Sequence, residues 1–256
     1  MKLGVQLYGS MHLYHNDPQK YLKDLKNAGY EIIEPCILFE GAPTNRGWRA
    51  EEFSCHAKLV KENAQKMISA HIIAEDFSKC TDEIVSIAKQ FEIKAMVVGF
   101  NGPFTNEEVE DFSKKCLKLI EKLQPVGTEL WLQNCGAEIR TKLNKITAYE
   151  AVLKYCDGRL GAQVDTGWVV CGGENLEDFL NRNAEYIRSI HHKDIFEISQ
   201  NLDDTQNVAI GDGIVDNKTA YNFAVKHNLG QLVDLDNAPG DFIEALAKSS
   251  TYLNKF

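Results

Sequence analysis

Ile190-His191-His192-Lys193-Asp194 closes an apolar run with two imidazoles, an amine and a carboxylate in consecutive positions. About one strand-helix unit earlier, a second apolar run ends in Val164-Asp165. In a parallel barrel, functional side chains come from the carboxyl ends of the strands and from the loops just beyond them. The two runs therefore predict a site at the rim of such a barrel, to which further strands contribute.

Short runs rich in Val, Ile, Leu and aromatic residues recur along the whole chain. They are nearly continuous in apolar character, as parallel strands covered on both faces require. We predict strands over residues 3–7, 32–37, 67–73, 95–98, 130–132, 160–164, 187–190 and 232–235.

Segments with helical periodicity lie between these runs. The segment over residues 18–29 follows Asp17, a suitable cap, carries Pro18 in its first turn and ends at Gly29. Further helices are expected over 54–66, 80–91, 106–123, 148–155, 176–183, 218–227 and 238–249. A strand-helix unit repeated in this way over 256 residues predicts a single (β/α)8 TIM barrel over residues 1–256, since a doubly wound sheet uses fewer strands. Gly211-Asp212-Gly213 follows a polar loop, so it predicts a turn and not a phosphate-binding fingerprint.

The composition bounds the class of partner. A hydrophobic content of 44% allows a large core, and a formal net charge of −9 disfavours general binding to nucleic-acid phosphates. No apolar stretch is long enough to span a membrane and the first residues do not resemble a signal peptide, so a cytoplasmic location is expected. The 7 cysteines include no C-x-x-C pair, which favours free thiols over a zinc ribbon or a disulfide framework. A small molecule is the expected partner, and the sequence leaves open whether the chain forms a homo-oligomer.

Polar side chains follow each of the last four predicted strands. The segments are Gln133 to Glu138, Asp165 to Trp168, His191 to Asp194, and Asp234-Leu235-Asp236. Three carboxylates and one histidine converging from adjacent strands predict a site for a divalent cation such as Mn, Mg, Co or Zn.

Each of these side chains also has a structural interpretation. Asp165 or Asp236 alone could cap the helix that follows its strand. Glu138 lies several residues beyond its apolar run and could be a solvated loop acid. Of His191 and His192, strand alternation directs only one into the barrel.

Taken in order and spacing, these motifs resemble those of the xylose-isomerase-like barrel superfamily, the sugar phosphate isomerase/epimerase group. The resemblance extends over nearly the whole chain and is strongest in its second half. It is carried by residues 3–8, 28–34, Ser69-Ala70-His71, Val164 to Trp168, His191 to Asp194 and Ile210 to Asp216.

The resemblance implies a divalent metal held by Glu138, Asp165, His191 and Asp234, with Glu138 and Asp234 also moving the proton from opposite faces of the substrate. Two departures from the family pattern stand out. The end of the fifth strand keeps Asn134 and Glu138, but Gln133, Cys135 and Gly136 replace its other polar positions. Asp234 stands where relatives carry glutamate, which shortens its reach by about 1.5 Å. Asp236, two residues on, faces the same side and is a substitute candidate.

Five residues are expected to touch the substrate. They are Glu34, His71, Asn134, Trp168 and Lys193. His71 resembles the inward histidine of the family and could otherwise be a hydrogen-bonded core residue, while Glu34 could bind substrate or anchor a histidine. Lys193 could contact substrate oxygens or pair with a carboxylate such as Asp194, and Trp168 could form an apolar wall for a sugar ring or plug the barrel mouth.

The resemblance implies a sugar, keto-sugar or sugar phosphate isomerase or epimerase that works through an enediolate next to a carbonyl. One alternative is a metal-dependent lyase that dehydrates a keto-inositol or a 3-keto-glycoside. Another is a sugar-binding barrel with impaired catalysis, which the changes at Gln133, Cys135 and Asp234 motivate. A DNA-repair nuclease is disfavoured by the negative charge and by the lack of additional histidines for a three-zinc cluster.

Overall fold

A parallel sheet closed into a barrel forms the centre of the protein, in a computed structural model that describes residues 2–238 and 240–256. Every strand expected from the sequence is found. The strands are β1 (Leu3–Gln6), β2 (Tyr30–Glu34), β3 (Cys36–Leu38), β5 (Ser69–Ile73), β6 (Ala95–Gly99), β7 (Glu129–Gln133), β10 (Gly161–Asp165), β11 (Ile187–His192) and β14 (Gly230–Val233).

The barrel closes through one broken strand. β2 pairs with β1, and β3 pairs with β5, so Pro35 joins two halves of a single barrel strand. Pro35 has no N–H to donate, which interrupts the ladder, but its carbonyl accepts a bond of 2.8 Å from the His71 amide. The remaining pairs, from β5 through β6, β7, β10, β11 and β14 to β1, are all parallel. The predicted (β/α)8 barrel is confirmed.

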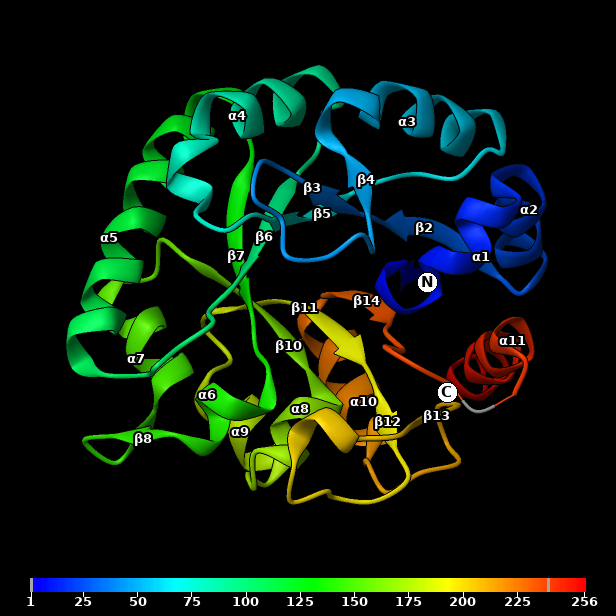
Figure 1. Ribbon diagram of the computed structural model, residues 1–256. Helices are drawn as coiled ribbons and strands as arrows, with labels where there is room; N and C mark the ends of the chain where they lie inside the picture. The colour runs from blue at the N-terminus through cyan, green and yellow to red at the C-terminus, as the bar shows by residue number, and fades with distance from the viewer. Residues whose placement is uncertain (1, 239) are drawn as a thin grey trace.

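Helices surround these strands as an outer ring (Figure 1). They are α1 (Met11–Asn16), α2 (Pro18–Asn27), α3 (Phe53–Glu62), α4 (Thr81–Gln90), α5 (Asn106–Leu123), α6 (Gly136–Arg140), α7 (Ala148–Tyr155), α8 (Thr166–Cys171), α9 (Leu176–Arg182), α10 (Asn217–His227) and α11 (Phe242–Leu253). Short 3-10 turns occupy Tyr8–Ser10, Ala50–Glu52, Phe77–Lys79, Gln124–Val126 and Leu202–Asp204.

Local sequence explains where the helices begin. Asp17 caps α2 as predicted, its carboxylate accepting a 3.0 Å bond from the Lys20 amide, and Gly29 takes the left-handed φ of 97° beyond the helix end. The helix predicted over residues 238–249 is α11, displaced toward the C-terminus because Asp241 caps it. Residue 239 of that prediction lies outside the described residues.

Short elements in the loops were not predicted. α1, α6 and α8 have too few residues to show a clear helical period. β4 (Trp48–Arg49) extends the sheet beside β3, and β8 (Lys142–Leu143) pairs with β9 (Ile146–Thr147), as β12 (Asp194–Ile195) does with β13 (Asn207–Val208).

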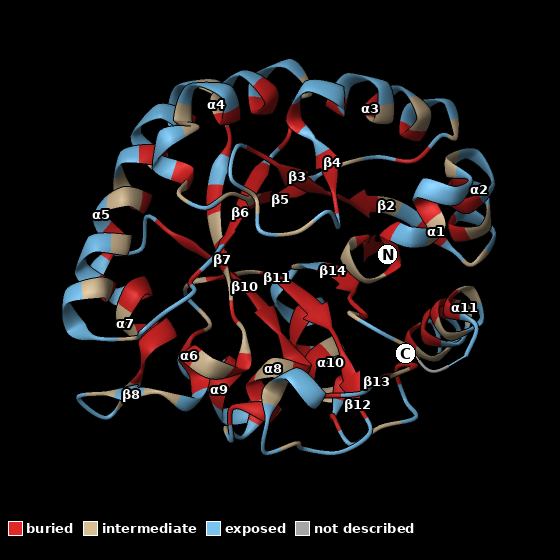
Figure 2. Ribbon diagram, in the orientation of Figure 1, coloured by how far each residue is buried: buried red, intermediate tan, exposed pale blue. Residues whose placement is uncertain are grey.

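The core lies between the barrel strands and the inward faces of the helices (Figure 2). α5 shows the pattern, because it buries Val109, Cys116, Leu119 and Leu123 on one face. Each fully buried aliphatic side chain of this size contributes roughly 1.5–3 kcal/mol through the hydrophobic effect. All seven cysteines are free thiols, as predicted. Among the described residues, none of the helices is both long enough and apolar enough to cross a membrane.

Candidate active site

A cavity of about 610 Å³ opens at the carboxyl ends of the barrel strands. Of the residues predicted for the site, His71, Trp168, Lys193 and Asp234 line this cavity. Gln133 and Asp236 also face it, together with Tyr8, Arg46, Asn101 and Cys135 from other strand ends and loops. Its mixed polar and aromatic lining suits a small polar ligand.

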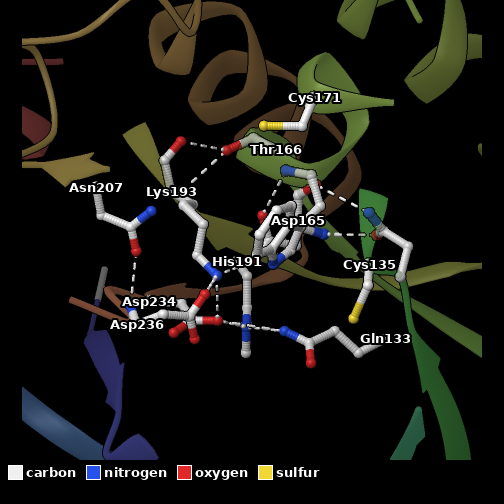
Figure 3. Close-up of polar contacts among 12 residues, drawn as sticks. Gln133, Cys135, Asp165, Thr166, Cys171, His191, Lys193, Asn207, Asp234 and Asp236 are labelled. Atoms are coloured by element: carbon white, nitrogen blue, oxygen red, sulfur yellow. Dashed lines mark hydrogen bonds and ion pairs between the residues drawn. The ribbon is translucent and has the colours of Figure 1, made fainter. Parts of the chain in front are cut away.

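Lys193 is the centre of the acidic cluster in this cavity (Figure 3). Its Nζ donates bonds to Asp236 Oδ2 at 2.6 Å and Asp234 Oδ2 at 3.2 Å, and it lies 2.9 Å from Asp165 Oδ2. Burial would lower the pKa of Lys193, but the three carboxylates hold that pKa well above its usual value. Lys193 therefore stands in the cavity as a fixed ammonium ion.

The segment after β10 is shaped around Lys193. Thr166 Oγ1 donates to the Lys193 carbonyl and accepts from the Lys193 amide, both at 3.0 Å. A Cβ at Gly167 would lie only 2.7 Å from Lys193 Cγ, so the missing side chain makes room for the lysine stem. The Trp168 ring lies 5.0 Å from Nζ, in cation-π contact.

Asp165 serves two purposes at once. Its Oδ1 accepts a 3.0 Å bond from the Trp168 amide and caps α8, while its Oδ2 faces Lys193. Asn134 fixes the backbone of Asp165 through bonds of 2.8 and 3.1 Å. Burial raises the pKa of Asp165 to about 7, although the charge of Lys193 opposes this rise. Asn134 is itself buried and does not line the cavity.

His191 lies beneath the acidic cluster, between two carboxylates. Its Nδ1 is 3.2 Å from Asp234 Oδ2 and its Nε2 is 2.7 Å from Glu34 Oε2. Burial would lower the pKa of His191, but Glu34 and Asp234 raise it to about 10. The Gln133 amide lies 2.9 Å from Nδ1 and 3.3 Å from Asp234 Oδ2, so it borders both groups.

His192 points the other way, as strand alternation predicts. Its ring nitrogens contact Asn217 Oδ1 at 3.1 Å and Gln231 Oε1 at 2.7 Å, outside the barrel. Burial lowers its pKa to about 4. His192 is therefore a neutral residue of the core.

A polar network under the cavity fixes the ring of His71. Gln163 donates its Nε2 to Glu34 Oε1 at 2.8 Å, which turns its Oε1 toward His71 Nε2 at 2.9 Å. Glu34 Oε2 is 3.1 Å from the same ring nitrogen, and Ser69 also donates to Glu34. Because both neighbours of Nε2 are acceptors, Nε2 carries a proton, and Nδ1 is the ring nitrogen left without a hydrogen-bond partner among the described residues.

Glu34 and Asp234 are the ionised acids of the site. Burial would raise the pKa of Glu34, but His191 and His71 hold it well below the usual range. Burial would likewise raise the pKa of Asp234, but Lys193 and His191 hold that pKa below its usual range. Glu34 does not line the cavity, and its Oε2 contacts both histidines, at 3.1 Å from His71 and 2.7 Å from His191.

The structure does not bring Glu138 into this cluster. Glu138 is the third residue of α6, and its Oε1 accepts a 2.6 Å bond from the Cys135 amide, which caps the helix. Its side chain is fully buried and does not line the cavity. Burial raises the pKa of Glu138 to about 8, so the carboxyl is protonated at neutral pH.

Asp194 anchors a loop and does not pair with Lys193. Its carboxylate accepts bonds from the amides of Ile195, Gly211, Gly213 and Val215 at 2.8–3.1 Å. The Gly-rich segment predicted as a turn thus wraps around Asp194, with Gly211 at a left-handed φ of 96°. This explains why the acid and the glycines occur together in the sequence.

Among the described residues, two groups of buried side chains have ligand atoms within 4.8 Å of one another and by spacing could hold a metal ion. They are Asp165, His191 and Asp234, and Glu34, His71 and His191. Three of the four predicted ligands therefore come together, and Glu138 is not among them. In the second group the Glu34 carboxylate is already contacted by Ser69, Gln163 and both histidines.

The first group, as arranged, does not fit a divalent ion. An ion bound to Asp165 Oδ2 at about 2.1 Å would lie within about 5 Å of Lys193 Nζ, which is 2.9 Å from the same oxygen. Repulsion between a double and a single positive charge at that distance is roughly 7 kcal/mol at an effective dielectric constant of about 20. A metal could bind here only if Lys193 moved away.

Two amides organise this site; the sequence identified Gln133 only as a departure from the family pattern and did not point to Gln163. Gln133 is the last residue of β7 and Gln163 is two residues before Asp165 in β10, so alternation directs Gln163 to the same side as that acid. Both positions were readable from the strand pattern, but amides gave no metal signal. The role of Gly167 depends on Lys193, which approaches from another strand.

Comparison with known structures supports the fold expected from the motifs. No family model and no curated protein matches the sequence. Among solved structures, a sugar phosphate isomerase/epimerase from Parabacteroides distasonis is similar, with a TM-score of 0.77, 17% identity and coverage of 98% of this chain and 94% of that one. The 3-keto-D-glucoside 4-epimerase YcjR from E. coli matches with a TM-score of 0.72 and 15% identity over 100% of both chains.

A third similar structure bears on the metal. A xylose isomerase-like TIM barrel protein from Mycobacterium smegmatis in complex with magnesium has a TM-score of 0.70 and 12% identity, covering 99% of this chain and 95% of that one. The chain therefore has the fold of the xylose isomerase-like TIM barrels, as the resemblance implied. At these identities the likeness establishes the architecture, and the chemistry must be argued from the side chains.

Proposed function

We propose that the protein is an isomerase or epimerase that moves a proton on the carbon next to the carbonyl of a small sugar or keto-sugar. The observation that carries this proposal is the meeting of an ammonium ion, an ionised carboxylate and an imidazole ring around one cavity. Lys193, Asp234 and His71 all line it. Such a set can bind a carbonyl oxygen, remove a proton and return it.

Proton transfer needs two groups that can approach the reacting carbon. His71 contacts Gln163 and Glu34 through Nε2, and its Nδ1 has no hydrogen-bond partner among residues 2–238 and 240–256. Asp234 is ionised and lines the cavity, and its buried Oδ1 has no hydrogen-bond partner within the described structure. We assign His71 and Asp234 as the acid/base pair, in place of the predicted pair Glu138 and Asp234.

The other polar groups position the substrate. Trp168 and Tyr8 offer aromatic faces in the cavity, and Arg46 and Asn101 offer donors to hydroxyl groups. Two structures with the same fold have names that include sugar epimerase or isomerase activity. The divalent ion implied by the resemblance remains a prediction, and no step of the proposed transfer requires it.

Deuterium exchange tests the proposal directly. The protein is incubated in deuterated water with D-fructose, D-tagatose, L-ribulose and a 3-keto-glucoside, and the products are examined by NMR. We expect solvent deuterium on the carbon next to the carbonyl of at least one ketose, with formation of an epimer or isomer. Exchange followed by loss of water would identify a lyase instead. Binding of a ketose without exchange would support the sugar-binding alternative and refute the proposal.

A further inference from the structure

We infer that Lys193 takes the place of a divalent cation, so that its ammonium group stabilises the negative oxygen of the reaction intermediate. The inference rests on the proposed function for its catalytic part and on geometry for its cation-binding part. Lys193 lines the cavity, and its Nζ lies within 3.2 Å of carboxylate oxygens of Asp165, Asp234 and Asp236. Two of these acids are residues for which the sequence predicts a metal.

The carboxylate oxygens that surround the ammonium group are atoms that could also be ligands of a metal cation. Asp165 Oδ2 and Asp234 Oδ2 both face Nζ, and the same two side chains form a metal-sized group with His191. The end of the fifth barrel strand contributes Gln133, a neutral amide, beside His191 and Asp234. The cluster thus surrounds one ammonium group with three carboxylates, those of Asp165, Asp234 and Asp236, while Gln133 adds no further negative charge.

The protein holds Lys193 in this position from several directions. Thr166 Oγ1 forms hydrogen bonds of 3.0 Å with both the amide and the carbonyl of Lys193. The same carbonyl also accepts a bond from Asn217 Nδ2 at 3.1 Å. Gly167 leaves space for its stem, and the whole side chain is buried. A lysine that merely neutralised surface acids would not need such a channel.

The chemical step balances without any further reactant. A C–H bond next to the carbonyl breaks, its proton goes to His71 Nδ1 or to the Asp234 carboxylate, and the electron pair moves onto the carbonyl oxygen. The three N–H groups of Lys193 contact three carboxylates, so the ammonium group exchanges its longest contact, 3.2 Å to Asp234 Oδ2, for a charged hydrogen bond to that oxygen while the intermediate exists. Return of a proton to the same or the neighbouring carbon restores the carbonyl and completes the epimerisation or isomerisation.

Manganese binding tests the cation-binding part without any substrate. Wild type, Lys193→Met and the control Lys226→Met, which alters an exposed lysine on α10, are titrated with Mn²⁺ and followed by electron paramagnetic resonance. We expect no stoichiometric binding by wild type or the control, and about one Mn²⁺ per chain for Lys193→Met. Stoichiometric Mn²⁺ in wild type would overturn the inference. Failure of the folded Lys193→Met protein to bind Mn²⁺ would overturn it as well.

Removal of Lys193 leaves the buried Asp165 and Asp234 and the partly buried Asp236 without their cation. Lys193→Met with Asp236→Asn therefore provides a second variant with less uncompensated charge. Thermal melting is recorded for both variants with and without Mn²⁺. We expect Mn²⁺ to raise the melting temperature of each variant but not that of wild type. If neither variant folds even with Mn²⁺, the inference is tested by the effect of EDTA and Mn²⁺ on exchange by the wild-type protein.

The exchange assay separates failure of this inference from failure of the proposed function. We expect wild-type exchange of the reactive ketose to be unchanged by excess EDTA and not stimulated by Mn²⁺, with Lys193→Met at least about 100-fold slower. Exchange that EDTA abolishes would overturn the inference while leaving the proposed function intact. Absence of exchange under every condition would refute the proposed function, and the Mn²⁺ titration would still decide the place of Lys193.

Discussion

Gly167→Ala should displace Lys193 without removing any polar group. The added methyl group would lie 2.7 Å from Lys193 Cγ, 3.0 Å from Cβ and 3.1 Å from Cδ. These atoms are at the root of the side chain, so the stem must shift as a unit. An ordinary contact between carbon atoms is about 3.5–4.0 Å, and therefore Cγ must move by about 1 Å.

Two effects of this substitution can be separated. Overpacking of a buried position costs roughly 1–3 kcal/mol, while the better helix propensity of alanine within α8 returns up to about 1 kcal/mol. We expect a net loss of about 1–2 kcal/mol in the free energy of unfolding. Because a 1 Å misplacement of a catalytic group can cost about 100-fold in rate, exchange should fall much more than stability.

Urea unfolding and ketose exchange measure the two effects on the same protein. Gly230→Ala is the matched control, since its Cβ would meet Ser189 atoms at 3.5 and 3.8 Å, which are ordinary contacts, at the opposite end of the barrel strands. The control should retain wild-type exchange. If Gly167→Ala unfolds at the wild-type urea midpoint and exchanges at the wild-type rate, the argument that Gly167 positions Lys193 is refuted.

Three further substitutions test separate parts of the structure. His71→Asn should slow exchange by about 100- to 10,000-fold with native circular dichroism, and near-normal exchange would remove His71 from the acid/base pair. Glu138→Gln should raise the free energy of unfolding by roughly 1–3 kcal/mol at pH 8, because burial raises the pKa of Glu138 to about 8. Between pH 4.5 and 8 the carboxyl ionises readily in the unfolded chain but not in the folded protein, which lowers the stability of wild type. Urea unfolding at several pH values should show this gain in stability disappearing as the pH falls toward 4.5. Loss of ketose exchange in Glu138→Gln would show that Glu138 acts on the substrate. Glu150→Gln should cost roughly 1–3 kcal/mol at pH 7, because bonds from Arg182 and Thr147 overcome burial and lower the pKa of Glu150 to about 2. That difference from wild type should disappear as the pH falls from 4.5 toward 2, and a difference independent of pH would contradict the assignment.

The barrel was predictable because its strands are covered on both faces. Such strands need nearly continuous apolar residues, and those runs are visible without any tertiary information. Helices with recognisable caps, such as α2 after Asp17, were equally readable. α6 and α8 were missed because five or six residues cannot display a helical period. Yet Trp168 of α8 and Cys135, which precedes α6, both line the cavity.

The site was predictable only where the strand-end rule applies directly. Asp165, His191 and Asp234 end or follow neighbouring strands, and the barrel brings them together. Glu138 lies three residues beyond Cys135, which is the spacing of a capping box, and its side chain turns back to cap α6. Strand position alone could not separate a capping acid from a ligand, since that depends on the path of the loop.

The motifs Asp165-Thr166-Gly167-Trp168 and His191-His192-Lys193 gain their meaning as a pair. Asp165 gives Lys193 a counter-ion, Thr166 fixes its backbone, Gly167 leaves space for its stem and Trp168 covers its ammonium group. Four consecutive residues of one segment thus meet a single lysine of the next strand. A metal ligand needs only one donor atom from such a segment, whereas a lysine used as a cation needs a channel along its whole length. The lysine channel therefore argues that Lys193 itself has been positioned for a role in the cavity, and that the acids around it serve the ammonium ion.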